Sequence, residues 1–466
     1  MRCLEVLRRD VFPHKLHCGC GIMARKRAGC KTHYLQVIQR GDMRRKGHRG
    51  IEMMYDSDMS NVLTVLLAGG MGERLYPLTK DRAKPAVPFG GMYRIVDFTL
   101  SNCFNSSCRR ICVLTQYKSN SLARHINRGW NIMHTELGEF IEVIPPQMRV
   151  NSNWYLGTAD AIYQNLYSID QNNPRIVLVV SGDHIYKMNY QKMVRQHQQT
   201  EADLTIAAIE VPVEEASRFG VFEVDATNRV IGFEEKPETP KPMPGKPERA
   251  LVSMGVYVFN VDVLRQSVIK DAEVSGSSHD FGKDIIPRLV RGKGAVYAYN
   301  FQDENQKEAQ YWRDVGTIDT YWEANMDLVS VDPQFNLYDR VWPMRTNLPT
   351  LPPAKFVFGE AGRRFGVAVD SIVSAGCIIS GGMVDRCVLG PLVRVNSYSH
   401  VQESILFEGA VIGRNCRIRR AIIEKNVRIP ENMVVGYDLR EDAKRFRVTH
   451  LGVVVIESAE KFNQGS

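Results

Sequence analysis

The sequence has no long hydrophobic run. No stretch approaches the roughly 18–20 uninterrupted apolar residues that a membrane span needs, so no membrane partner is expected. No serine precedes Ser57 and the N-terminal segment has no apolar core, which argues against a transit peptide and a secretory signal. With 44% hydrophobic and 24% charged residues in a chain of 466, the composition excludes collagen-like, wholly disordered and disulfide-dense proteins. These absences favour a cytoplasmic globular protein with more than one domain.

Paired cysteine motifs are also missing. The ten cysteines form no CxxC units and no zinc-finger spacing, so neither a zinc site nor a disulfide framework is expected. Four of them lie in the first 50 residues. The other six are interpreted as reduced, mostly buried thiols; they are Cys103, Cys108, Cys112, Cys377, Cys387 and Cys416.

Positive charge is concentrated at one end of the chain. The net charge is +8, from 60 basic and 52 acidic residues. Residues 1–50 hold 13 of the basic and three of the acidic groups, so the remainder has 47 and 49 and is nearly neutral. This segment has only Phe12 and Tyr34 as aromatics, too few for the base stacking of a single-strand nucleic-acid binder. Residues 1–59 are therefore predicted to be a basic disordered extension or a mis-assigned start, with no nucleic-acid partner.

Buried strands and helices alternate after residue 60. Short apolar runs at 62–70, 111–115, 176–183, 204–209 and 254–259 predict strands. Between them, residues 159–169 and 190–199 predict helices, the first with Thr158 placed as a cap. This order predicts an α/β domain over residues 60–346, with helices on both faces of its sheet, ending in a proline-rich linker at 347–364.

The last hundred residues repeat with a period of six. A hexad spacing fits neither a helix nor a hairpin and indicates a parallel β-helix whose aliphatic residues stack inside the coil. We place this domain at 365–455 and a tail at 456–466. The predicted inward residues are Ile372, Ile378, Val384, Leu389, Val395, Val401, Leu406, Ile412, Ile418, Ile423, Ile429 and Val435.

A glycine-rich loop follows the first predicted strand. LAGGMGERL (67–75) allows backbone N–H groups to approach a phosphate chain, although it lacks the GKT or GKS ending of a Walker loop and the dinucleotide spacing. Arg74 and the nearby RAKP (82–85), with Arg82 and Lys84, add the positive charge that a polyphosphate leaving group requires.

Two aspartates and one lysine stand at informative places. Asp183, in SGDHIY, follows an apolar strand, where ligands and metals bind in α/β sheets. Asp314, in YWRDVGT, could converge with it on one hard cation. Lys236, in EEKP, is suited to hold a phosphate at the end of a strand.

Ten ordered motifs carry a resemblance to a known family. They are GGxGxRL, RAKPAVPFGG, DFTLSNC, WYLGTADA, SGDHIY, FEEKP, SMGVYVF, SSHDFGKDIIP, YWRDVGT and YDRVWPMRT. In this order, over about residues 60–455, they resemble bacterial glucose-1-phosphate adenylyltransferase, also called ADP-glucose pyrophosphorylase. The resemblance implies an α/β nucleotidyltransferase domain with a Rossmann-like mixed sheet, followed by a left-handed parallel β-helix. It also implies transfer of the adenylyl group of ATP to α-D-glucose 1-phosphate and a Mg²⁺ cofactor.

The resemblance also implies roles for individual residues. Arg74, Lys84 and Asp183 would be catalytic, and Asp183 and Asp314 would bind the metal. ATP would be held by Gly69, Gly70, Gly72, Gln147, Tyr155 and Gly157. Glucose 1-phosphate would be held by Glu235, Lys236, Ser253, Tyr257, Asp280 and Trp312. Such enzymes are usually homotetramers regulated by small anionic effectors, which Arg414, Arg417, Arg419 and Arg420 could bind here.

Three positions depart from the family pattern. Met71 and Glu73 stand where relatives often have Arg and Thr, which puts side-chain contacts of the glycine loop in doubt but not its backbone. Asp81 stands where some relatives have a basic residue.

Other functions remain open at this stage. A uridylyl-, thymidylyl- or guanylyltransferase would have similar local chemistry, because only the long motifs favour adenine and glucose. A hexapeptide coil can also carry an acyltransferase, for which His400 is the one histidine in 365–449. A non-catalytic regulatory subunit would be expected to have lost Lys84, Asp183, Lys236 or Asp314, and all four are present.

Overall fold

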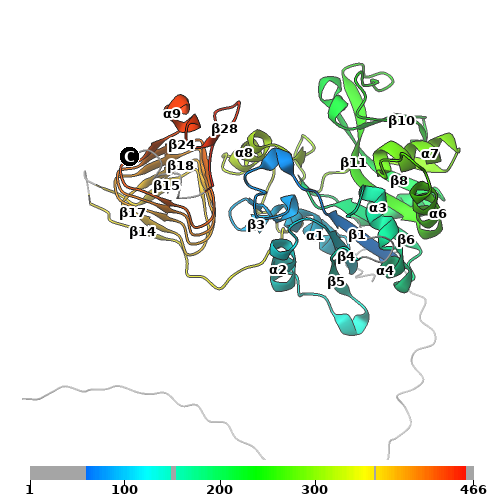
Figure 1. Cartoon of the computed structure of the whole chain (residues 1–466), viewed down its shortest axis with the longest axis horizontal. Coiled ribbons are helices and arrows are strands. Elements are labelled where there is room, and N and C mark those ends of the chain that lie inside the picture. Colours follow the sequence, from blue (N-terminus) through cyan, green and yellow to red (C-terminus); the bar gives the residue numbers. More distant parts are fainter. Residues whose placement is uncertain (1–58, 148–153, 361–363, 458–466) are drawn as a thin grey trace, which may run out of the picture. The chain divides into compact units, whose positions relative to one another are not determined.

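The computed structural model describes residues 59–147, 154–360 and 364–457 (Figure 1). The predicted basic extension lies outside these ranges apart from Met59, as does the predicted tail after Glu457. Alternating strands and helices build the first part, and short regular strands build the second, so the predicted fold class is confirmed.

A mixed sheet is the framework of the first part. In the described ranges it has nine strands, with the order β10-β9-β11-β6-β1-β4-β5 and with β8 and β12 joined beside β11. Strands β1, β4, β5 and β6 run parallel, whereas β11 is antiparallel to both β6 and β8. The strands are β1 (Val62–Ala68), β4 (Arg110–Thr115), β5 (Phe140–Ile144), β6 (Ile176–Ser181), β8 (Leu204–Pro212), β9 (Gly220–Val224), β10 (Val230–Glu235), β11 (Arg249–Asn260) and β12 (Val296–Asn300).

Helices cover both faces of this sheet, because its strands alternate apolar side chains to either side. From β1, Leu66 and Ala68 pack with α1, α2 and α5, whereas Leu63 and Val65 pack with α3, α6 and α7. The helices before the β-helix are α1 (Ile95–Asn105), α2 (Asn120–Gly129), α3 (Thr158–Gln164), α4 (Leu166–Gln171), α5 (Tyr190–Gln199), α6 (Val261–Ala272) and α7 (Ile286–Arg291). Two further helices, α8 (Ile318–Asp327) and α9 (Leu439–Ala443), lie next to the β-helix and within it.

The predicted helix over 159–169 is two helices, α3 and α4, which meet at Asn165. The capping role predicted for Thr158 is wrong. The residue before α3 is Gly157, and the Thr158 hydroxyl instead donates to Asp280 Oδ2 at 3.0 Å and accepts from Phe281 N–H. A tertiary contact thus replaces the local one.

Three sheets form the β-helix of the second part, and their strands pair in parallel except β28, which is antiparallel to β29. Their orders are β14-β17-β20-β23-β26, β15-β18-β21-β24-β27 and β16-β19-β22-β25-β29-β28. The first strand, β14, already lies within the segment predicted as a linker. The strands are β14 (Lys355–Val357), β15 (Val367–Val369), β16 (Ile372–Val373), β17 (Ile378–Ser380), β18 (Met383–Asp385), β19 (Val388–Leu389), β20 (Arg394–Val395), β21 (His400–Gln402), β22 (Ile405–Leu406), β23 (Val411–Ile412), β24 (Arg417–Arg419), β25 (Ala421–Ile423), β26 (Arg428–Ile429), β27 (Val434–Val435), β28 (Arg447–Val448) and β29 (Val454–Ile456).

Ten of the twelve predicted inward residues are buried, and the first two are wrong by one position. Val373 and Ile379 align with the stacks, not Ile372 and Ile378. The first coil is one residue shorter than the next, because Val373 pairs with Leu389, 16 residues on, whereas Leu389 pairs with Leu406, 17 residues on. A fixed spacing of six residues therefore assigns the wrong residues to the interior in this first part of the β-helix.

Helix α8 packs against the sheet that contains β16, β19, β22 and β25. The outward residues Val388, Ile405 and Ile422 share an apolar cluster with Trp322 and Leu328 of the α8 region. Polar contacts join the same parts: Trp322 Nε1 donates to the Glu403 carbonyl at 2.8 Å. The α8 helix is therefore fixed between the β-helix and the segment that precedes it in sequence.

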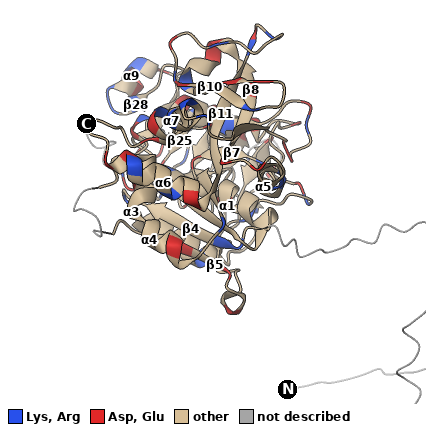
Figure 2. Cartoon of the chain, turned by 90° about the vertical axis from the view of Figure 1, so that its right-hand side faces the viewer, with Lys and Arg blue, Asp and Glu red and all other residues tan. Residues whose placement is uncertain are grey.

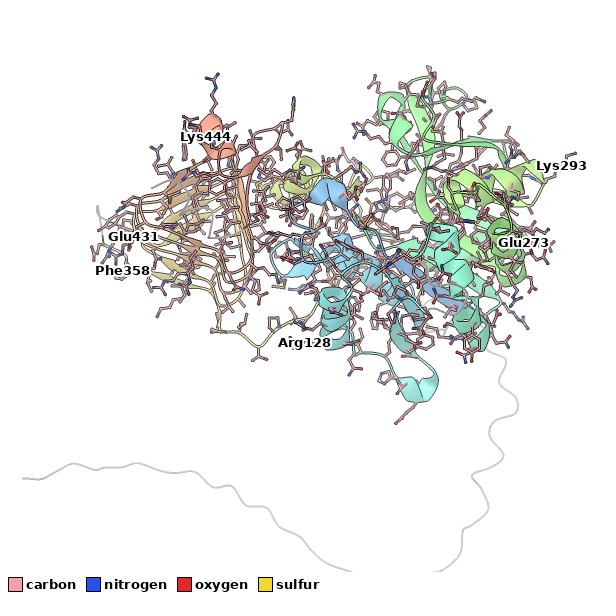
Figure 3. All side chains as sticks on the ribbon, viewed as in Figure 1. Arg128, Glu273, Lys293, Phe358, Glu431 and Lys444 are labelled. Carbon is pink, nitrogen blue, oxygen red and sulfur yellow. The ribbon has the colours of Figure 1, made fainter. Side chains whose placement is uncertain are left out.

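Surface charge in the described ranges is mixed. Lys and Arg (blue) and Asp and Glu (red) are both scattered over the elements visible in Figure 2, as the nearly neutral count beyond residue 50 predicts. Exposed ends such as Lys293 and Lys444 point outward (Figure 3). All six cysteines after residue 100 are free and buried, as predicted. No helix among the described residues is both long and apolar enough to cross a membrane.

Candidate active site

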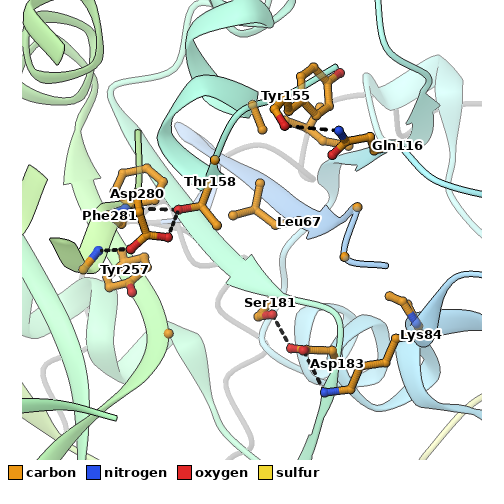
Figure 4. A pocket seen from close by; sticks show the side chains of 18 of the residues that line it. Leu67, Lys84, Gln116, Tyr155, Thr158, Ser181, Asp183, Tyr257, Asp280 and Phe281 are labelled. Carbon is orange, nitrogen blue, oxygen red and sulfur yellow. Dashed lines mark hydrogen bonds and ion pairs between the residues drawn. The ribbon is translucent and has the colours of Figure 1, made fainter. Parts of the chain in front are cut away.

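A cavity of about 490 Å³ opens at the carboxyl ends of β1 and β6. Its wall combines residues far apart in sequence, because parallel strands end at one edge of the sheet. Figure 4 shows Lys84 and Asp183 on one side of it and Asp280 with Tyr257 on another. Ten predicted site residues line it: Gly69, Gly70, Lys84, Tyr155, Gly157, Asp183, Glu235, Lys236, Tyr257 and Asp280.

The glycine loop leaves β1 and turns sharply before Lys84. Gly72 has φ +63°, and a Cβ there would lie 2.9 Å from Lys84 Cβ, so a side chain is excluded on both counts. Thr79 Oγ1 fixes the turn by donating to the Gly72 carbonyl at 3.0 Å. Met71 is 53% exposed, and Glu73 is exposed as well. Neither side chain lines the cavity, so the departures from the family pattern leave the backbone of the loop intact.

Lys84 lies between two carboxylates. Its Nζ is 2.9 Å from Asp183 Oδ2 and 2.8 Å from Asp314 Oδ1, and its side chain is only 8% exposed. Burial alone would lower the pKa of Lys84, but the two carboxylates outweigh it and raise that pKa above its ordinary value. Burial likewise opposes ionisation of Asp183, yet Lys84, His184 and Ser181 hold its pKa well below the usual range. Both groups are therefore charged at neutral pH.

A small sheet brings the two aspartates together. Strand β7 (His184–Tyr186) pairs antiparallel with β13 (Trp312–Asp314), and in this register Asp314 faces His184. Ligand atoms of Asp183, His184 and Asp314 all lie within 4.8 Å of one another. Lys84 bridges both carboxylates and Arg74 Nη2 lies 3.8 Å from Asp314 Oδ2, so oxygen donors and positive charge meet at one point of the wall. The donor set fits a hard cation with mainly oxygen ligands.

The opposite wall is built on strand ends β10 and β11. Glu235 ends β10, and Lys236, with φ +51°, turns its Nζ to within 3.1 Å of Glu235 Oε1 while remaining 59% exposed in its side chain. Tyr257 follows a bulge in β11 and stacks against Phe281 at 5.3 Å between ring centroids. Burial first, then the nearby Asp280, raises the pKa of Tyr257 above its ordinary value. The phenol thus stays neutral and can donate a hydrogen bond.

Tyr155 and Gly157 line the wall nearest β4. The Tyr155 hydroxyl accepts a hydrogen bond from Asn165, and its carbonyl accepts one from Gln116 Nε2 at 3.2 Å. A Cβ on Gly157 would lie 2.2 Å from the His279 carbonyl oxygen, so only glycine permits this close approach of two backbone segments.

A second cavity, of about 790 Å³, shares Lys236 with the first. It contains Arg74, Trp312 and Asp314, three predicted site residues. Arg74 is 70% exposed and its Nη2 lies 3.8 Å from Asp314 Oδ2. Trp312 Nε1 is buried and has no hydrogen-bond partner among the described residues.

Three predicted residues line neither cavity, namely Gly72, Gln147 and Ser253. Gln147 donates to its neighbour Pro145, and Ser253 accepts from Gly255 N–H. Conversely, the sequence reasoning missed Gln116, Thr158, Ser181 and His184, all of which line the first cavity. His184 could have been predicted, because it directly follows Asp183 in the motif SGDHIY.

Two family models match the chain. A family model described as nucleotidyl transferase matches residues 63–331, more than half of the chain. A second, described as GlmU-like C-terminal hexapeptide, matches residues 352–456. The chain is therefore a nucleotidyl transferase domain followed by a hexapeptide domain, a class that generally uses divalent metal ions.

Similar proteins of known name identify the family within this class. The glucose-1-phosphate adenylyltransferase of Koribacter versatilis is 58% identical over 400 residues, which cover 85% of this chain and 95% of the relative. That of Rhodopirellula baltica is 55% identical over 410 residues, covering 87% and 92%. That of Anaeromyxobacter sp. is 53% identical over 408 residues, covering 86% and 99%. The chain belongs to the glucose-1-phosphate adenylyltransferase family.

Proposed function

We propose that the protein transfers the adenylyl group of ATP to α-D-glucose 1-phosphate, giving ADP-glucose and diphosphate, the activating step of bacterial glycogen synthesis. The observation that carries this proposal is the meeting of Lys84, Asp183 and Asp314 beside the glycine loop, in a chain of this family. A regulatory subunit without catalysis would have no need to preserve that cluster.

Asp183 and Asp314 are the proposed ligands of Mg²⁺. When bound, the ion supplies positive charge to the phosphate oxygens. Gly69 and Gly70 lie on the cavity wall and have no side chain, so their backbone N–H groups would be accessible to the triphosphate. Lys84 and Arg74 would offset charge on the departing diphosphate. Tyr155 and Gly157 would border the nucleotide, while Gln147 would need to move to reach it.

Glucose 1-phosphate would lie against the opposite wall. Lys236 would hold the phosphate, and Glu235 and Asp280 would accept hydrogen bonds from sugar hydroxyls. Tyr257 would donate through its neutral phenol. Trp312, whose indole N–H lacks a partner among the described residues, would complete this side.

The bond changes need positioning more than acid–base chemistry. A phosphate oxygen of the sugar phosphate forms a bond to the α-phosphorus of ATP, and the bond from that phosphorus to the β-phosphate oxygen breaks. Diphosphate leaves with the electron pair. Since the attacking oxygen is already an anion, no general base is required, and the walls of the cavity act by alignment and charge neutralisation.

The metal requirement is the first test of this proposal. With ATP and glucose 1-phosphate, we expect equal amounts of ADP-glucose and diphosphate, complete loss of turnover in excess chelator, and recovery when Mg²⁺ is restored. Chromatography of the nucleotide products measures this directly. Undiminished turnover in chelator would contradict the metal assignment.

Replacing Lys236 with Ala should raise the apparent KM for glucose 1-phosphate. The loss of one charge-assisted hydrogen bond, about 2 kcal/mol, corresponds to a roughly 30-fold rise. The kcat and the KM for ATP should change less than about threefold. Steady-state kinetics on both substrates measure the change, with Lys270→Ala on the exposed face of α6 as the matched control. A selective rise in the KM for ATP would contradict the role.

We also propose regulation by a small anion bound beside α8. A cavity of about 420 Å³ contains Arg386, Arg419, Arg420 and the single carboxylate of Glu403. Glu403 forms ion pairs with all three arginines, including one of 3.9 Å to Arg420 Nε, and the Arg420 guanidinium lies 4.7 Å from the Trp322 ring. Arg414 and Arg417, also suggested by the sequence, do not line this cavity. Excess positive charge suits a phosphorylated or carboxylated molecule.

Activity measured against a panel of phosphorylated sugars and organic acids tests this regulation. A change in activity with an effector that persists in the double variant Arg419→Gln, Arg420→Gln would place the effector site elsewhere.

We further propose that the protein forms the homotetramer usual in the family. Light scattering of the full chain measures its mass in solution, and a monomer would contradict this proposal.

A further inference from the structure

A buried carboxylate outside the cavity binds the loop that carries Asp280. Asp271, in the last turn of α6, is 1% exposed and lines neither of the two cavities. It nevertheless accepts three side-chain hydrogen bonds, from Ser277 Oγ, His279 Nδ1 and Arg288 Nη2, each at 2.9 Å. A carboxylate can only accept, so His279 must present an N–H at Nδ1. Such a concentration of donors on one buried anion fixes the loop that carries them.

The loop after α6 contains a residue with an unfavourable backbone conformation. His279 has φ +52°, in the left-handed region that a residue with a side chain seldom adopts. Its N–H donates to Ser277 Oγ at 3.0 Å, so Ser277 connects the backbone to Asp271. The side-chain bonds to Asp271 therefore stabilise a conformation that the chain alone disfavours.

The same loop contacts the first residues of α3. The carbonyl of His279 accepts a hydrogen bond from Ala159 N–H at 2.8 Å. Gly157 packs so closely on this carbonyl that a Cβ would come within 2.2 Å of it. A shift of His279 would consequently move the Gly157 segment, which lines the cavity on the proposed nucleotide side.

The next residue, Asp280, faces the cavity. Its Oδ1 accepts from Gly282 N–H at 2.9 Å, and its Oδ2 accepts from Thr158 Oγ1 at 3.0 Å (Figure 4). The loop thus joins both substrate walls, Asp280 on the sugar-phosphate side and Gly157 with Thr158 on the nucleotide side.

We propose that Asp271 and His279 are positioning residues that set the distance between the two substrate walls. Neither touches substrate; they act through the backbone of His279 and the placement of Asp280. The expected change in KM rests on the proposed function. The expected effect of Asp271 and His279 on the conformation of the loop does not depend on it.

Two substitutions at His279 test the kinetic consequence. Asn places an N–H donor close to the position of Nδ1 and tolerates φ > 0, whereas Ala supplies no donor. We expect His279→Ala to raise the KM for glucose 1-phosphate about tenfold with a smaller change in kcat, and His279→Asn to remain within about threefold of wild type. Asp271→Ala should resemble His279→Ala. Equal kinetics for the Ala and Asn variants, whether both normal or both impaired, would overturn the proposal.

A matched control separates positioning from general loss of stability. Asp203 accepts a backbone N–H from Ala295 at 2.9 Å beside the start of β8, away from the substrate loop. Asp203→Ala should lower the thermal midpoint without changing either KM. If it raised the KM as much as His279→Ala, the positioning role would be lost.

Hydrogen exchange tests the structural content without any assay of activity. In His279→Ala we expect faster exchange of backbone amides in residues 157–161 and 277–283, and unchanged exchange there in Asp203→Ala. Wild-type protein that fails to form ADP-glucose would contradict the proposed function alone, because the exchange result would still decide this inference. Unchanged exchange in both segments would overturn it.

Discussion

Asp183→Asn is expected to lower kcat by about 10³-fold, equivalent to about 4 kcal/mol of transition-state stabilisation. Asparagine keeps the shape of the side chain but removes the charge that faces Lys84 at 2.9 Å and that would bind the metal. It would also turn an amide donor toward either Lys84 or Ser181, both of which donate to this carboxylate. Single-turnover and steady-state assays at saturating Mg²⁺ measure the loss.

The loss of stability in this variant should be modest, because Asp314 still pairs with Lys84 at 2.8 Å and the Asp183 side chain is 31% exposed at the cavity wall. Thermal unfolding of Asp183→Asn, beside Asp170→Asn on the exposed face of α4, separates loss of function from loss of fold. Near-normal turnover in a folded Asp183→Asn protein would contradict the metal assignment.

Asp97→Ala is expected to cost about 4 kcal/mol in free energy of unfolding. Asp97 is fully buried and accepts hydrogen bonds from four groups: Arg94 N–H, His125 Nε2, Trp130 Nε1 and Thr346 Oγ1, at 2.7–2.9 Å. Alanine would leave these donors buried without an acceptor, and one of them, Thr346, lies 249 residues away in sequence.

Urea unfolding followed by tryptophan fluorescence measures this cost as a lower midpoint at constant slope. The matched control is Asp262→Ala, whose carboxylate is 77% exposed and pairs with Arg265 on the surface of α6. Its expected cost is below about 1 kcal/mol. Equal costs for the two variants would show that the buried hydrogen bonds of Asp97 contribute little.

Much of the fold could be predicted because its signals are local. Runs of apolar residues at 62–70 and 176–183 identify β1 and β6, and the hexad period identifies the β-helix. The register error at Ile372 and Ile378 arose where a coil is one residue shorter, a local deviation that a fixed period cannot contain. The split between α3 and α4 at Asn165 was likewise hidden in a continuous helical pattern.

The site was only partly predictable, because its geometry depends on long-range pairing. Convergence of Asp183 and Asp314 requires β7 to pair with β13, strands more than a hundred residues apart, and no local pattern shows that pairing. The position of Lys84 between both carboxylates follows from the same pairing. The role of Thr158 depends on Asp280, which lies on a different element.

The central claim, that this cavity transfers an adenylyl group to glucose 1-phosphate, is tested most directly by a nucleotide panel. Diphosphate release is measured with glucose 1-phosphate and Mg²⁺ in the presence of ATP, UTP, dTTP or GTP, each over a range of concentrations. We expect a kcat/KM for ATP at least about 100-fold above that for any other nucleotide, and ADP-glucose as the product. Equal or higher kcat/KM with UTP, dTTP or GTP would contradict it.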